Sequence, residues 1–203
     1  MRVWANAAPW MARLSLVGFA LSACAPPALT LYALGAAGGG PVDAPVMPPL
    51  RPGPVVIEIA RVTLPDYLDT QDILLRRGST LEASKTGRWA SRLSLGATAL
   101  LAARLAETRP DALVTTQSQS TTPTYRLLVE ISRLDLEAGV APTGRATLEA
   151  DWLIVPRDAS IPTTRDRVRL VSAGLVGSDQ DLVALETALL SRLADAIDIR
   201  RLR

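Results

Sequence analysis

YRLLVEIS, residues 125–132, alternates apolar and polar side chains with a period of two. The odd-numbered residues from Tyr125 to Ile131 are apolar, and Arg126, Glu130 and Ser132 stand among the even-numbered ones. Successive side chains of a strand point to opposite faces, so this stretch has one apolar face and one charged face. That pattern is typical of a half-buried strand in an antiparallel sheet. Residues 145–154, which contain Trp152, repeat it, and residues 139–144 begin and end with glycine and connect the two.

Further along the chain, the pattern predicts one more strand and a helix. Residues 167–174 alternate again after the Pro-containing connection 156–164. Ser178 and Asp181 have the spacing of a capping box, with aspartate in place of the commoner glutamate. Apolar residues at helical spacing follow, at Leu182, Leu185, Leu189, Leu193 and Ile197. We expect Arg200, Arg201 and Arg203 to lie in the last turn of this helix, where cations are favoured.

Toward the N-terminus, the β-branched run 55–62 predicts a strand that ends at the turn Leu64-Pro65-Asp66-Tyr67-Leu68-Asp69. Two alternatives stand for Tyr67 and Leu68. They close the edge of the core, or they form a docking surface, since loops often carry function. Residues 73–76 and 80–84 predict a hairpin around the turn 77–79. Residues 113–116 predict a short strand.

A change of period at residues 88–107 predicts a second helix. Trp89, Leu93, Ala97 and Leu101 recur at helical spacing, and Pro110 follows soon after the end. The sequence therefore predicts an α+β domain with a mainly antiparallel sheet and two long amphipathic helices packed on one face.

The N-terminal region has the features of a bacterial lipoprotein signal. Arg2 and Arg13 precede the apolar run 14–21, and Leu21-Ser22-Ala23-Cys24 ends it. The run to Cys24 is too short for a membrane-spanning helix, which needs about 20 residues. The pattern resembles a lipobox, in which the cysteine receives a diacylglycerol, the chain is cut before it and the new amino terminus is acylated. Translation starts at Met1 or at Met11.

Three segments follow from this assignment. Residues 1–23 form the signal peptide, 24–54 a lipidated Pro/Gly-rich tether, and 55–203 the periplasmic α+β domain. Within the tether, residues 29–34 predict a short strand that docks on the sheet edge. The net charge of +2 belongs to the signal, because Arg2 and Arg13 leave with it. The charge therefore gives no indication of nucleic-acid binding.

The composition disfavours catalysis. The chain has no histidine and one cysteine, so it has no Cys/His zinc site, no Ser-His-Asp or Cys-His relay and no internal disulfide. Gly38-Gly39-Gly40 opens no helix and matches no phosphate-binding loop. We expect a protein that is not an enzyme and needs no metal or cofactor.

With these residues in view, the sequence resembles the ABC-type transport auxiliary lipoprotein family. The resemblance rests on the lipobox, on Leu31-Tyr32-Ala33-Leu34 and above all on Val62-Thr63-Leu64-Pro65-Asp66-Tyr67-Leu68. Trp89 at a helix start, the strand around Trp152 and the final helix extend it.

The resemblance implies a protein held by lipid to the periplasmic face of the outer membrane. It would serve as a non-catalytic accessory component of a system that moves lipids between membranes, together with an ABC permease complex and an MCE-domain protein. The family is expected to self-associate. Pro65, Asp66, Tyr67, Leu68, Trp89 and Trp152 are the candidate partner-docking or family-motif residues. Two alternatives stay open: a periplasmic lipid-binding carrier with its own cavity, and an envelope-assembly lipoprotein independent of any ABC transporter.

Overall fold

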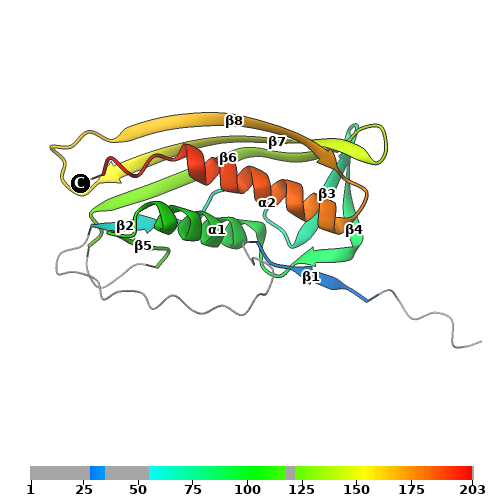
Figure 1. Cartoon of the computed structure of the whole chain (residues 1–203), viewed down its shortest axis with the longest axis horizontal. Coiled ribbons are helices and arrows are strands. Elements are labelled where there is room, and N and C mark those ends of the chain that lie inside the picture. Colours follow the sequence, from blue (N-terminus) through cyan, green and yellow to red (C-terminus); the bar gives the residue numbers. More distant parts are fainter. Residues whose placement is uncertain (1–27, 35–54, 118–121, 203) are drawn as a thin grey trace, which may run out of the picture.

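The computed structural model describes residues 28–34, 55–117 and 122–202. The lipobox residues Leu21, Ser22, Ala23 and Cys24 lie outside these ranges, as does most of the predicted tether. The described residues form one eight-stranded sheet and two helices (Figure 1). The strands are β1 (Thr30–Tyr32), β2 (Val56–Ile59), β3 (Asp72–Arg77), β4 (Thr80–Trp89), β5 (Leu113–Thr115), β6 (Tyr125–Ala138), β7 (Thr143–Pro156) and β8 (Thr164–Leu175). The helices are α1 (Leu93–Thr108) and α2 (Asp179–Ala196).

Strand β6 is the centre of the sheet. Along one edge it pairs with β7 over its whole length, and β7 in turn pairs with β8, both antiparallel as predicted. The other edge is shared by β2 at its start and β3 at its end, with a bridge from Thr63 to Glu130 between them. Beyond β2 lies β5, and beyond β3 lie β4 and then β1.

The expectation of a mainly antiparallel sheet is wrong, because the sheet is mixed. Among the described strands, four of the seven pairings are parallel: β1 with β4, β2 with β5, β2 with β6 and β3 with β6. The physical reason is the path between β2 and β3, which makes a turn at residues 66–68 and then continues along β6 without reversing. An alternating pattern reports which face of a strand is buried and contains no information about strand direction.

A β-bulge explains why strand β6 is longer than the pattern predicts. Tyr125 and Ile131 are buried on the same face, but beyond the irregularity between Ile131 and Arg133 the buried apolar residues are Leu134 and Leu136. The extra residue of a bulge moves the following side chains to the opposite phase. The alternation in which the odd-numbered residues are buried therefore stops by Ser132, whereas the strand itself continues to Ala138.

The two helices lie side by side on the same side of the sheet (Figure 1). The capping box of α2 is confirmed: the Ser178 hydroxyl accepts from the Asp181 amide, and the Asp181 carboxylate accepts from the Ser178 amide. Between helices and sheet lies an extensive core. Its most fully enclosed side chains are Ile57, Ile59, Ile73, Leu101, Leu105, Leu127, Ile131, Leu148, Leu189, Leu190, Leu193 and Ile199.

Two predicted helix boundaries are wrong. Trp89 ends strand β4 and does not start a helix, since its amide donates to the Gln71 carbonyl at 2.7 Å and α1 begins at Leu93. Helix α2 ends at Ala196, so Arg200 and Arg201 follow the helix instead of forming its last turn; Arg203 lies outside the described residues. Buried Ile197 and Ile199 hold that segment against the core, which overrides the helical continuation.

Candidate docking site

The turn that contains Pro65, Asp66, Tyr67 and Leu68 divides its side chains between core and surface. It is closed by the Leu68 and Asp69 amides, which donate to the Pro65 carbonyl at 2.9 and 3.2 Å. Leu68 is only 4% exposed, whereas Tyr67 is 43% exposed. Leu68 therefore packs in the core, which is one of the two alternatives left by the sequence. Tyr67 lies at the surface, where a partner can contact it.

Asp69 fixes this turn to the start of α1. Its carboxylate accepts from the Ser94 amide at 3.1 Å and forms an ion pair with Arg61 at 3.1 Å. Burial opposes ionisation of this carboxyl, but the Ser94 hydrogen bonds and the charges of Arg61 and Arg92 outweigh it and lower the pKa of Asp69. The residue before α1, Arg92, makes no side-chain cap, so Asp69 supplies from a distant loop the acceptor that the first turn lacks.

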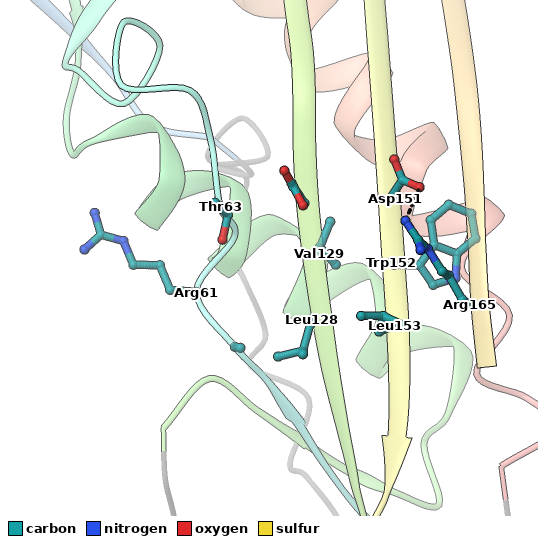
Figure 2. A pocket seen from close by; sticks show the side chains of 10 residues that line it. Arg61, Thr63, Leu128, Val129, Asp151, Trp152, Leu153 and Arg165 are labelled. Carbon is teal, nitrogen blue, oxygen red and sulfur yellow. Dashed lines mark hydrogen bonds and ion pairs between the residues drawn. The ribbon is translucent and has the colours of Figure 1, made fainter. Parts of the chain in front are cut away.

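Next to the turn, the face of the sheet opposite the helices contains a hollow of about 320 Å³ (Figure 2). Leu128 and Leu153, which are register partners on β6 and β7, give it an apolar floor. Asp151 and Arg165, 3.5 Å apart, border one side, and Thr63 borders the other. Figure 2 shows Arg61 at the margin with its side chain directed away from the strands. A small apolar group of a partner, with polar groups around it, would fit this hollow.

An ionic network lies on the same open face. Asp135, only 6% exposed, accepts from Arg76 at 2.9 Å and from Arg133 at 2.7 Å, and Arg133 also reaches Glu137 at 2.9 Å. The hydrogen bond that the Arg76 guanidinium donates to the Asp135 carboxylate raises the pKa of Arg76. The period-two spacing of Arg133, Asp135 and Glu137 on β6 is visible in the sequence, but their partner Arg76 comes from β3, and that pairing depends on the sheet.

The two tryptophans singled out from the sequence are not exposed on this surface, although Trp152 is among the residues that line the hollow. Trp89 and Trp152 are both buried in the core. Trp152 faces the helices from β7, on the side away from Leu153. Their role in this structure is packing, and Tyr67 is the aromatic residue of the predicted set that reaches the surface.

One buried titratable group was also missed. Glu186 of α2 is enclosed in a small cavity with Leu68, Leu93, Leu134 and Leu136. Burial raises the pKa of its carboxyl to about 8. A signal existed in the sequence, because Glu186 lies four residues after Leu182 and thus on the apolar stripe of α2.

Neither metal binding nor membrane crossing finds support in the described ranges. No group of three or more His, Cys, Asp or Glu side chains there could hold a metal ion. Neither helix of this part of the chain is long and apolar enough to cross a bilayer.

Comparison with known proteins identifies the family. The family model described as the ABC-type transport auxiliary lipoprotein component matches residues 40–198. The chain belongs to this family. The match begins within the predicted tether and includes the turn, both helices and strands β2 to β8. The resemblance noted from the residue motifs is thereby confirmed.

Solved structures share the fold of this transport auxiliary lipoprotein at low sequence identity. A crystal structure of an uncharacterized protein aligns with a TM-score of 0.62 and 15% identity, covering 83% of this chain and 95% of the other. A protein from Xanthomonas campestris aligns with a TM-score of 0.57 and 12% identity, covering 72% and 85%. No curated protein sequence matches the chain.

Proposed function

We propose that this family member is anchored by lipid at Cys24 to the periplasmic face of the outer membrane. There it acts as a non-catalytic adaptor in an intermembrane lipid transport system with an ABC permease complex and an MCE-domain protein. The family match supports the accessory role in ABC-type transport. The lipobox at residues 21–24 and the absence of histidine from the chain support the anchor and the lack of catalysis.

The observation that carries the adaptor proposal is the exposed aromatic ring of Tyr67 on a turn that is fixed in place. Asp69 ties the turn to α1, so little conformational entropy is lost when a partner covers the ring. Tyrosine is enriched among residues that contribute most to interfaces. The hollow beside the turn offers Leu128 and Leu153 as a second contact. Tyr67 and the hollow together form the proposed partner surface.

The space between the helices and the sheet does not favour the carrier alternative. The cavity that holds Glu186, between helices and sheet, has room for about 10 Å³, which is close to the minimum for a single water molecule. A lipid acyl chain does not fit there. The hollow on the open face has room for about 320 Å³, but it is an open depression bordered by charged side chains, which does not suit a lipid acyl chain.

Co-purification tests the adaptor role. Tyr67→Ala in the full-length lipoprotein should release the ABC complex while leaving the melting temperature nearly unchanged, because the side chain is largely exposed. Leu95→Ala is the matched control, since Leu95 of α1 is 48% exposed and lies outside the proposed surface. Retention of the complex by Tyr67→Ala, or equal loss in both variants, would contradict the docking role.

A second experiment tests the anchor and the self-association separately. Cys24→Ala should leave a folded protein that no longer fractionates with the outer membrane; normal recovery of this variant in that fraction would exclude lipid anchoring. Native mass spectrometry of the protein without its lipid should show oligomers free of bound lipid. A lipid-loaded monomer would instead support the carrier.

A further inference from the structure

Strand β1 brings the start of the described chain onto the edge of the sheet. It pairs in parallel with β4, with Leu31 opposite Arg88, and the Ala90 amide donates to the Tyr32 carbonyl at 2.7 Å. It has no second neighbour in the described sheet, so its other edge is open. The predicted strand at residues 29–34 is thus docked on the body of the protein.

This docking shortens the distance between body and anchor. If the body began at residue 55, the Pro-rich chain between Cys24 and it could extend to about 90 Å, at about 3 Å per residue. With β1 in the sheet, Leu29 follows Cys24 by five residues, and an extended chain of that length spans at most about 18 Å. The edge of the sheet at β1 therefore stays next to any membrane that holds Cys24.

The side chains at this edge are apolar and exposed. Leu29 is 53% and Leu31 64% exposed, although leucine at a solvated strand edge is the feature that natural sheets normally avoid. Arg88, the register partner of Leu31, is paired with Asp72 at 2.9 Å. The charge beside Leu31 is therefore already compensated within the protein.

We propose that Leu29 and Leu31 contact the lipid surface itself, so that the protein rests on the bilayer through strand β1 as well as through its acyl chains. This inference rests on the proposed anchoring at Cys24. Apolar side chains gain free energy at the headgroup boundary, and a second contact fixes the orientation of a lipid-anchored body. With β1 against the membrane, β8 at the far edge of the sheet points away from it.

A site-specific probe tests this contact. Cys24 is the only cysteine, and in the mature lipoprotein its sulfur is blocked by lipid, so an environment-sensitive fluorophore can be attached uniquely in Leu31→Cys. Val171→Cys is the matched control, since Val171 is 46% exposed on β8. Both lipidated proteins are incorporated into phosphatidylethanolamine–phosphatidylglycerol vesicles, with and without lipids that bear a quenching spin label near the headgroup.

The proposal predicts that spin-labelled lipid reduces the emission of the probe at position 31 and leaves that at position 171 unchanged. Equal emission with and without the label at position 31, in protein that floats with the vesicles, would overturn the lipid contact while leaving the anchor intact. A blue-shifted but unquenched probe would also overturn it, because a second copy of the chain would then cover β1. Protein that does not float would refute the anchoring, and this contact with it.

Discussion

Replacement of Glu186 by glutamine should remove a pH dependence built into the core. The carboxyl lies in the small cavity under Leu68 and Leu93, where burial raises its pKa from 4.5 to about 8. The pKa of Glu186 is higher in the folded state than in the unfolded state, so folding favours the neutral acid. Below pH 4.5 both states hold the neutral acid and the group does not affect stability. As the pH rises from 4.5 toward 8, the free energy of unfolding falls. Asp72, which also lines the cavity, forms an ion pair with Arg88 at 2.9 Å.

The size of the effect follows from proton linkage. Each pH unit between the two pKa values costs about 1.4 kcal/mol of unfolding free energy, so raising the pH from 5 to 8 should cost the wild-type protein about 4 kcal/mol through this group. Glu186→Gln resembles the neutral acid in shape and does not titrate. The variant should therefore match wild type near pH 5 and exceed its stability by about 4 kcal/mol at pH 8.

Urea unfolding of both proteins at pH 5, 6, 7 and 8 measures this difference. The comparison cancels the contributions of the other titrating groups, which the two proteins share. Glu107→Gln is the control for loss of a carboxylate at the surface, because Glu107 lies on α1 with an exposed side chain paired with Arg104. Parallel profiles for wild type and Glu186→Gln would refute the assignment of a neutral buried acid.

The remaining predictions concern the turn, the ionic network and the α2 cap, each measured by urea unfolding at pH 7. Leu68→Ala should cost about 2–5 kcal/mol, since it empties a buried site; a cost near zero would place Leu68 at the surface. Asp135→Ala should cost about 1–3 kcal/mol, because Arg76 and Arg133 lose their shared acceptor while both remain partly exposed to water; additive costs with Arg133→Ala would contradict that coupling. Ser178→Ala should cost about 1 kcal/mol through the lost cap, and an unchanged midpoint would show that Asp181 suffices alone.

The sequence by itself determined the local features of this protein. The period-two pattern at residues 125–132 correctly assigned the buried face of β6, and Ser178 with Asp181 correctly marked the start of α2. These features depend on neighbours within a few residues, so their physical causes are contained in short stretches. The turn around Pro65 was also found, because proline and aspartate restrict the backbone locally.

Only the tertiary structure decided how those elements meet. Parallel pairing of β2 and β3 with β6 depends on where the intervening turn directs the chain, which no alternation encodes. Trp89 had helical spacing but joined β4, because β1 and Gln71 offer its segment strand partners from elsewhere in the chain. The neighbouring residues Tyr67 and Leu68 received opposite environments for the same reason. Burial is set by the elements that surround a side chain, and α1, α2 and β6 come from distant parts of the sequence.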